Sequence, residues 1–342
     1  MTRKRLGLIL GFSLLAVAIG LAIFRSRTAA FSFAAFGAAL RHVDWRWLVT
    51  SQTMMLATYL GRALRWQVML RPVKKDASLW RILSATVIGF TMIMLFGRAG
   101  EPVRPYLIAK NEGVSFSSQV AAWVLERILD LMMVLLIFGL ALTRIAATGI
   151  HPGPKIQIAL QTAGYTAGST AIVCLALLIV LRGLTETTQG RILKAISSLP
   201  QAVTSRAERL LKAFSEGASS TRTASNAILL VAYSGLEWGI ITLGIVFLFR
   251  AFPGTAALSL SDIIIFLGFV NFGSVLQLPG VGGGLQIAAV LVLTELFGIS
   301  VEIASGFALV LWLVSFVTIV PVGLVLALHE GVKLSSLRDL KT

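Results

Sequence analysis

Charged residues are scarce in this chain. Of its 342 residues only 13% are Asp, Glu, Lys or Arg, against roughly 25% in a typical soluble protein. Hydrophobic residues make up 56%, and the mean hydropathy is +0.87. Several apolar runs are long enough to cross a bilayer. The composition therefore excludes a soluble globular domain and predicts an integral membrane protein with several spans.

Cysteine and the common catalytic motifs are also scarce. The single cysteine, Cys174, cannot form an internal disulfide, and we interpret it as a small packing residue. The sequence has no GxxxxGK[ST] or HExxH motif, no plausible Ser/His/Asp arrangement, and its three histidines show no ligand spacing. We therefore expect no cofactor, no metal site and no enzymatic activity.

Acidic residues are half as frequent as basic ones, 15 against 30, and the net charge is +15. In a soluble protein this excess would indicate nucleic-acid binding. Here the basic residues gather between the apolar runs, where they orient a membrane protein and contact anionic headgroups. We therefore expect membrane lipids, and no nucleic acid, as partners.

Uninterrupted apolar runs predict six transmembrane helices, at residues 6–24, 47–69, 118–143, 158–181, 224–249 and 302–328. Two further runs are broken by glycine and proline: 82–96 is followed by GRAGEPVRP, and 262–278 is followed by PGVGGG. Such breaks interrupt the helical hydrogen bonds and leave backbone amides unpaired. At membrane depth, unpaired amides are tolerated only inside protein or along a cavity. We therefore predict two re-entrant helical hairpins, at 82–110 and 262–298.

Loop charge predicts how these elements cross the membrane. With the N-terminus inside and both hairpins returning to their starting side, most of the 30 Lys and Arg lie inside, as the positive-inside rule requires. If the first broken run crossed fully, the basic segment 182–222 would lie outside. The prediction is an all-α integral membrane protein, with about six transmembrane helices plus two oppositely oriented re-entrant hairpins. It forms one polytopic domain, 1–342, in the plasma or inner membrane, with both termini cytoplasmic.

The segment 182–222 is predicted to be cytoplasmic, basic and amphipathic. Its apolar residues share one helical stripe, formed by Val203, Ala207, Leu210, Leu211 and Phe214, and its basic residues Arg206, Arg209 and Lys212 lie off that stripe. Such a helix either lies on the inner membrane surface with its basic groups toward anionic lipid, or packs on its own protein. The sequence leaves both readings open.

Three charged residues, Glu126, Arg127 and Asp130, interrupt a long apolar run. A charge at that depth costs at least about 2.5 kcal/mol, so it is normally paired or placed in a watery cavity. Residues three or four apart are neighbours on a helix, so we predict that Arg127 pairs with Asp130. Glu126 is then free to pair with Arg98 or Arg104. The alternative is mutual neutralisation without a ligand.

The first break carries Arg98, Glu101 and Arg104 within seven residues of GRAGEPVRP. Two guanidinium groups can hold a phosphate through forked hydrogen bonds, and Glu101 can orient one of them or meet a cationic headgroup. These residues are therefore candidates for substrate binding. The alternative is an ion-pair network that only pins the hairpin.

Other polar positions lie in or beside apolar runs. Glu237 falls in the middle of a span and is a functional candidate by default, unless it is protonated and bonded to a backbone carbonyl. Arg62 and Arg65 close the second span, and we interpret them as basic anchors that reach the membrane surface.

The second break is the last candidate region. Gly283 and Gly284 offer bare backbone that a lipid phosphate can approach closely, and Gln286 follows them. Tight packing of the hairpin explains the glycines equally well.

At these motifs the chain resembles the membrane region of the lysylphosphatidylglycerol synthases, a flippase-like family also known as uncharacterised protein family 0104. The matching pieces are GRALRWQVML at 61–70, GRAGEPVRPYLIA at 97–109, ERILD at 126–130 and the PG…GG break at 279–284. The R-x-G-E-x-x-R-P string followed by E-R-x-x-D is the most specific of them.

The resemblance implies a two-hairpin membrane domain that moves lipids between leaflets. It implies an anionic phospholipid or a polyprenyl-phosphate-linked molecule as substrate, and it leaves a homo-oligomer open. In bifunctional members a soluble aminoacyl-transferase domain follows, whereas this chain ends shortly after its last predicted span, so we expect that activity to be absent. The alternative is a membrane enzyme or accessory subunit acting on a lipid-linked glycan or an aminoacyl-phospholipid.

Overall fold

The computed structural model describes residues 31–147, 154–183, 186–195, 223–273, 277–278 and 282–331, with isolated positions between 197 and 211. The predicted first span, both chain termini and the tip of the second break lie outside these residues. Apart from one pair of two-residue strands, the regular structure of the described part is helical. The predicted all-α membrane class is confirmed.

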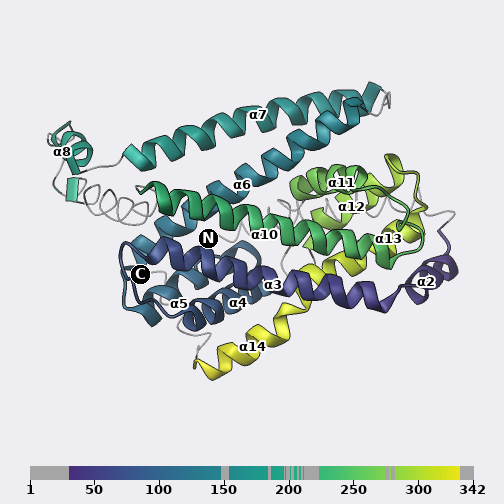
Figure 1. Cartoon of the computed structure of the whole chain (residues 1–342), viewed down its shortest axis with the longest axis horizontal. Helices are drawn as coiled ribbons and strands as arrows, with labels where there is room; N and C mark the ends of the chain where they lie inside the picture. The colour runs from purple at the N-terminus through teal and green to yellow at the C-terminus, as the bar shows by residue number, and fades with distance from the viewer. Residues whose placement is uncertain are drawn as a thin grey trace, which may run out of the picture.

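Figure 1 shows the helices as an elongated bundle. η2 is a 3-10 turn and η4 is a π-helical turn. In chain order the helices are α2 (Phe33–Arg41), α3 (Trp45–Leu70), α4 (Leu79–Phe96), η2 (Gly97–Gly100), α5 (Val103–Glu112), α6 (Phe116–Ala147), α7 (Pro154–Gly183), α8 (Glu186–Ala195), α10 (Ala224–Ala251), α11 (Leu260–Gly273), α12 (Gly284–Glu295), α13 (Val301–Trp312), η4 (Leu313–Val317) and α14 (Ile319–His329).

Helices of membrane-crossing length make this a multi-pass membrane protein. Among the described residues, four are long and apolar enough to cross a bilayer: Leu79–Gly100, Phe116–Ile145, Ser225–Ala251 and Val301–His329. The last three coincide with predicted spans. The predicted second span corresponds to α3, which has 26 residues and carries three arginines. The predicted fourth span corresponds to α7, whose apolar part is the shorter stretch Gly164–Leu177.

Helices α3 and α10 run side by side along most of their length (Figure 1). Near one end of the pair, the Ser51 hydroxyl donates a 2.7 Å hydrogen bond to the Gly244 carbonyl. Two large apolar cores lie toward opposite ends of α3. One contains Met55 and a group of phenylalanines from α10, α11 and α13, and the other contains Trp66 and residues of α4, α5 and α6.

At the position of the predicted first hairpin, the short 3-10 turn η2 joins two helices, α4 and α5. α4 ends at Gly97, whose φ of 62° is favourable only for glycine. The chain then turns through η2 and enters α5, which packs back against α4 (Figure 1). A Cβ on Gly89 of α4 would lie 2.5 Å from the Cβ of Arg104, so the missing side chain lets α5 approach closely. Entry of this unit from the cytoplasmic side stays a prediction.

The second break joins α11 and α12, which also pack against each other. Two short antiparallel strands, β1 (Gln277–Leu278) and β2 (Gly282–Gly283), close the connection, with Gln277 opposite Gly283. α12 then begins at Gly284. The break therefore ends in strand β2 directly before a helix, at the position of the predicted second hairpin.

A π-helical turn interrupts the last long helix. The Thr318 amide donates to the Leu313 carbonyl five residues earlier, at 3.1 Å. The Gln52 side chain of α3 donates to the Thr318 hydroxyl at 2.9 Å and so fixes this turn against α3. π turns inside α-helices occur frequently at functional sites. This one places Ser315 and Phe316 beside a cavity described below.

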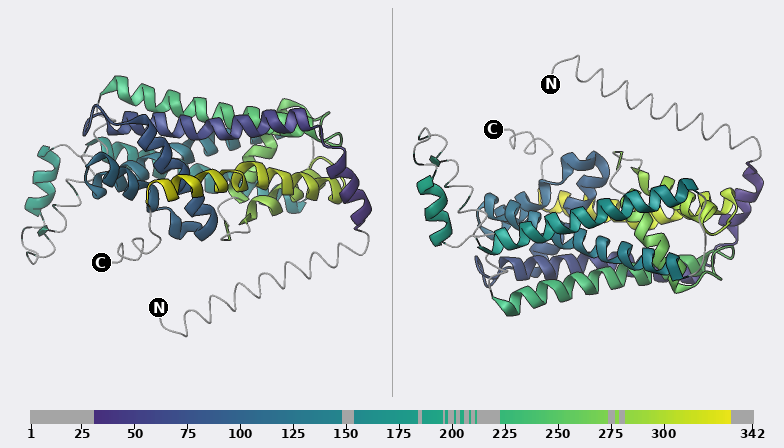
Figure 2. Two further views of the ribbon diagram at one scale, coloured as in Figure 1. Left: turned by 90° about the horizontal axis from the view of Figure 1, so that it is seen from below. Right: turned by 90° about the horizontal axis from the view of Figure 1, so that it is seen from above.

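The basic segment 182–222 is described only in part. α8 covers its beginning, and Figure 2 shows α8 at one end of the bundle. Most of the predicted apolar stripe lies outside the described residues. Its member Leu211 packs against a small cluster formed around Ile128 and Cys174.

Candidate functional site

Arg65 of α3 is fully buried and forms the centre of a network of charged side chains. Its Nη1 donates to Asp130 Oδ1 at 2.7 Å and to Ser234 Oγ at 3.0 Å. Its Nη2 donates to Glu126 Oε1 at 2.7 Å and lies 3.3 Å from Glu237 Oε2. One guanidinium group therefore joins α3 to carboxylates of α6 and α10.

Glu126 is bound by a second arginine, from the first break. Arg104 Nη1 contacts both Glu126 oxygens at 2.9 and 3.0 Å, and both side chains are buried. The Arg104 guanidinium also lies 4.1 Å from the ring centroid of Trp66, a favourable cation–π distance. Of the two partners that the sequence allowed for Glu126, the structure selects Arg104.

Arg127 and Asp130 form the pair predicted from their helical spacing, with 3.0 Å between Nη2 and Oδ2. The Arg127 side chain is 43% exposed, and its Nη2 also lies 3.5 Å from Glu126. Asp130 therefore has two arginine partners, Arg127 at the edge of the network and Arg65 at its centre.

Glu237 of α10 is the third carboxylate of the network. Its Oε1 lies 2.9 Å from Arg62 Nη2, and its Oε2 lies 3.3 Å from Arg65 Nη2. Neither contact has hydrogen-bond geometry. Charge attraction to two arginines thus holds this buried carboxylate, and no bond to a backbone carbonyl is found among the described residues.

We call these seven residues the charge cluster: Arg62, Arg65, Arg104, Arg127, Glu126, Asp130 and Glu237. With every group ionised, four guanidiniums face three carboxylates. No further carboxylate contacts the cluster in the part of the chain that the structure describes. The cluster therefore carries a surplus of one positive charge, and Arg127 at its edge is 43% exposed.

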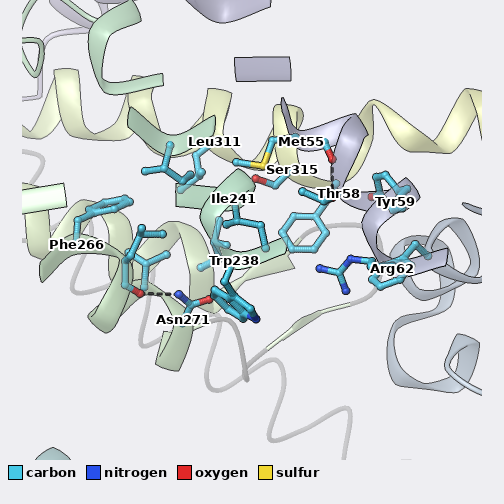
Figure 3. A pocket seen from close by; sticks show the side chains of 16 residues that line it. Met55, Thr58, Tyr59, Arg62, Trp238, Ile241, Phe266, Asn271, Leu311 and Ser315 are labelled. Atoms are coloured by element: carbon cyan, nitrogen blue, oxygen red, sulfur yellow. Dashed lines mark hydrogen bonds between the residues drawn. The ribbon is translucent and has the colours of Figure 1, made fainter. Parts of the chain in front are cut away.

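A cavity of about 170 Å³ adjoins the cluster. Figure 3 shows the Arg62 side chain extending toward the interior of the cavity, with the Trp238 indole beside it. The remaining walls come from α3, α4, α10, α11, α13 and η4, and from Leu285 in the first turn of α12. Phe90 belongs to the helix before the first break and Leu285 follows the second break, so the cavity touches both broken elements.

Two polar atoms at the cavity have no hydrogen-bond partner among the described residues: Nε of Arg62 and Nε1 of Trp238. Arg62 also stacks on Phe90, with 4.6 Å from its guanidinium carbon to the ring centroid. Asn271 lies on the opposite wall, where its amide donates to the Leu267 carbonyl at 2.7 Å. The cavity thus has a mainly apolar lining, and two of its lining residues carry buried donors with no partner among the described residues.

The two arginines predicted to hold one phosphate have different surroundings. Arg104 is buried against Glu126, whereas the Arg98 side chain is 64% exposed and lies 3.3 Å from Glu101. Joint binding of a phosphate by Arg98 and Arg104 requires a rearrangement of the first break. Their roles as binding residues stay a prediction.

The candidates in the second break lie around the start of α12. The Gln286 side chain accepts a 2.7 Å hydrogen bond from the Gly283 amide, one turn earlier, and Gly284 is the first residue of the helix. This contact satisfies one of the amides that a helix leaves unpaired at its N-terminus. Gln286 therefore has a capping role that needs no ligand.

The interpretation of Arg62 and Arg65 as surface anchors is wrong. Both side chains turn into the bundle, where Arg65 is fully buried and Arg62 is 16% exposed. A signal was available in the sequence: Glu126, Asp130 and Glu237 are three acids in apolar runs, and Arg127 can balance only one of them. The other acids require basic partners from elsewhere in the chain.

Within the described ranges, no group of three or more His, Cys, Asp or Glu side chains is arranged to hold a metal ion. The polar side chains of the charge cluster and the cavity carry guanidinium, carboxylate, indole, hydroxyl and amide groups. These groups bind and exchange charged partners through hydrogen bonds and ion pairs.

Comparison with known protein families identifies the family of this chain. The family model described as the lysylphosphatidylglycerol synthase TM region matches residues 8–323. The matched range contains the whole charge cluster, the cavity and both breaks. No curated protein and no solved structure matches the chain.

Proposed function

The chain belongs to the family defined by the transmembrane region of lysylphosphatidylglycerol synthase, and we propose that it moves an anionic lipid headgroup between the two leaflets. The family and the apolar helices make it a membrane protein that acts on lipids. In the proposed mechanism, the headgroup passes beside the charge cluster while the acyl tails stay in the bilayer.

The observation that carries this proposal is the surplus of one positive charge in the cluster next to the cavity. Four arginines and three carboxylates form the cluster, and one of the arginines, Arg62, also lines the cavity. A phospholipid with one negative charge would neutralise the cluster while it occupies the cavity. Ionisable groups inside membrane proteins commonly mark the path of a substrate.

The cavity lining supports transport without a chemical step. No His, Cys, Lys, Asp or Glu lines the described walls, and Tyr59 is the one side chain there of a type that serves as a general acid or base. The sequence has no GxxxxGK[ST] motif for a nucleotide. We therefore propose a non-enzymatic translocator that works without nucleotide hydrolysis.

A reconstitution experiment tests the proposal. The purified protein is placed in vesicles that contain headgroup-labelled fluorescent phosphatidylglycerol in both leaflets. An impermeant reductant then quenches the label from outside. A translocator exposes inner-leaflet label, so quenching should proceed beyond the outer-leaflet fraction. Quenching equal to that of protein-free vesicles would contradict the proposal and favour an accessory subunit that needs a partner.

A further inference from the structure

The π-helical turn η4 divides the last long helix into two parts that pack against different broken elements. α13, before the turn, packs against α12, which follows the second break. α14, after the turn, packs against α4, which precedes the first break. In Figure 1, α13 lies with α11 and α12 toward one end of the bundle, and α14 extends away from them. The turn is therefore the joint between a segment packed on one broken element and a segment packed on the other.

Both parts of this helix are anchored by specific contacts. In α13, the Phe307 ring packs edge-on against Phe249, with 4.6 Å between the ring centroids. In α14, the Ile319 carbonyl accepts a 3.4 Å hydrogen bond from the Thr91 hydroxyl of α4. A Cβ on Gly323 would lie 2.7 Å from the Cβ of Thr91, so α14 and α4 touch closely. Movement between the two parts must therefore be taken up in η4.

The hydrogen bonds along the helix are weakened on both sides of Thr318. In a regular α-helix the Thr318 amide would donate to the Val314 carbonyl, but here it donates to Leu313 at 3.1 Å. Pro321 has no amide hydrogen and cannot donate to the Val317 carbonyl four residues earlier. π turns and prolines are two of the recognised causes of helix kinks. The helix is therefore built to bend at this point.

Gln52 of α3 holds the turn from outside the helix. Its side-chain nitrogen donates to the Thr318 hydroxyl at 2.9 Å and lies 3.5 Å from the Val314 carbonyl. The Thr318 hydroxyl donates to the same carbonyl at 3.1 Å. The two side chains thus support the carbonyl that the π turn deprives of the Thr318 amide. Loss of Gln52 should therefore weaken the π form.

η4 also forms a wall between the cavity and the outside of the bundle. Ser315 and Phe316 line the cavity, and Figure 3 shows Ser315 among the lining side chains. On the other side of the same turn, Leu313 is 37% exposed and Thr318 is exposed. The wall is therefore one helix thick at this point, and the bilayer lies outside it.

We propose that η4 is a lateral gate through which a lipid headgroup enters the cavity from the bilayer. The structure shows the form in which the wall is in place and Gln52 is bonded to Thr318. A π turn contains one more residue than an α turn, and one residue corresponds to about 100° of rotation in a helix of 3.6 residues per turn. Return of η4 to α-helical hydrogen bonds therefore turns Phe316 away from the cavity. This inference rests on the proposed function and assigns an entry route to it.

Labelling from within the bilayer tests the gate. The full-length protein with Cys174→Ala and Thr58→Cys is placed in vesicles that contain a phospholipid with a maleimide on its headgroup. Thr58 lines the cavity and is 5% exposed, so the probe must enter the cavity to react. Cys174 is the single native cysteine, and intact mass spectrometry follows the product. A charged, water-soluble maleimide is the comparison probe, because it arrives through water.

Two variants change the gate in opposite directions. Gln52→Leu removes the amide that holds the π form. Its matched control is Thr53→Val, because the Thr53 hydroxyl donates to the Val49 carbonyl of its own helix at 2.9 Å. Pro321→Ala restores the missing amide and stiffens the helix. Its matched control is Pro253→Ala, at an exposed turn residue.

The lipid-attached maleimide should label Thr58→Cys about 2- to 10-fold faster in Gln52→Leu, which is the effect of one hydrogen bond on an equilibrium. Pro321→Ala should slow the labelling by a similar factor. Thr53→Val and Pro253→Ala should keep the parent rate. The rate with the water-soluble maleimide should not respond to Gln52→Leu. If Gln52→Leu does not yield monodisperse protein, the proline pair carries the test.

Three outcomes would overturn the gate: no labelling by the lipid-attached maleimide in any variant, equal rates in each variant and its control, or equal acceleration of both probes by Gln52→Leu. The last outcome would mean that the cavity opens to water. The vesicle assay separates this inference from the proposed function. Translocation by a protein whose labelling ignores Gln52 and Pro321 rejects the gate and keeps the function. The expected labelling pattern in a protein that translocates nothing rejects the function and keeps η4 as an opening between cavity and bilayer.

Discussion

Arg65 of α3 donates a 2.7 Å hydrogen bond to Glu126 of α6, and neither side chain is exposed. Glu126 also binds Arg104, which belongs to the helix after the first break. One carboxylate therefore fixes the broken element to two long helices. The same contacts that build the candidate site also hold the bundle together, so variants must be chosen to separate binding from folding.

The buried centre of the charge cluster should matter more for stability than its edge. Arg65→Leu leaves buried carboxylates without their main partner, which costs on the order of 3–5 kcal/mol. Arg127→Leu should cost less than about 1 kcal/mol, because Arg127 is 43% exposed and Asp130 keeps Arg65. Thermal unfolding in detergent measures both. Equal losses of stability in the two variants would show that Arg65 contributes no more to the stability of the charge cluster than Arg127 does.

The close approach of α5 to α4 should depend on Gly89. Gly89→Ala places a Cβ 2.5 Å from the Cβ of Arg104, and overpacking of this kind costs about 1–3 kcal/mol. Gly139→Ala in α6 is the matched control, because a Cβ there meets no atom within 4 Å. The apparent Tm should fall for Gly89→Ala and hold or rise for Gly139→Ala. The prediction is wrong if both variants behave alike.

Gln286 should act on stability through the start of α12. Gln286→Leu removes the acceptor that binds the Gly283 amide, and loss of such a cap costs about 0.5–2 kcal/mol. Gln286→Glu keeps the acceptor and adds a negative charge at a helix N-terminus, where it is favourable. We expect the glutamate variant to keep both its Tm and its rate of lipid exposure. A variant that folds normally but stops lipid exposure would instead show that Gln286 contacts the headgroup.

Cysteine labelling tests the orientation. The prediction that segment 182–222 is cytoplasmic rests on loop charge. Ser197 is exposed, so Ser197→Cys in a Cys174→Ala background should react with an impermeant maleimide only after the cells are opened. Labelling of intact cells would place the segment outside and require the first broken run to cross the membrane.

Local sequence was sufficient for the long helices of the described residues, for the positions of both breaks and for contacts within one helix, but α2 was not predicted. Arg127 pairs with Asp130 because residues three apart share a helix face. Gly97 ends α4 because the chain needs a positive φ at that residue. Each of these depends only on neighbours along the chain, so periodicity and glycine placement predict it.

Contacts between helices could not be predicted in the same way. Arg62 and Arg65 lie near the end of an apolar run, where long basic side chains usually reach the membrane surface. They turn inward because α3 packs along α10, and because Glu237 of α10 and Glu126 of α6 lie within reach. That packing is a property of the whole bundle. Only the surplus of intramembrane acids indicated that these arginines had buried partners.

The most direct test of the account is a comparison of translocation rates for two labelled lipids and three proteins. Wild type should expose inner-leaflet phosphatidylglycerol faster than phosphatidylcholine. Arg62→Gln should lose this preference. Arg250→Gln should keep it, because Arg250 is an exposed residue that donates to the Ala256 carbonyl away from the charge cluster. Equal rates for both lipids in the wild type, or an unchanged preference in Arg62→Gln, would contradict an anion path beside the charge cluster.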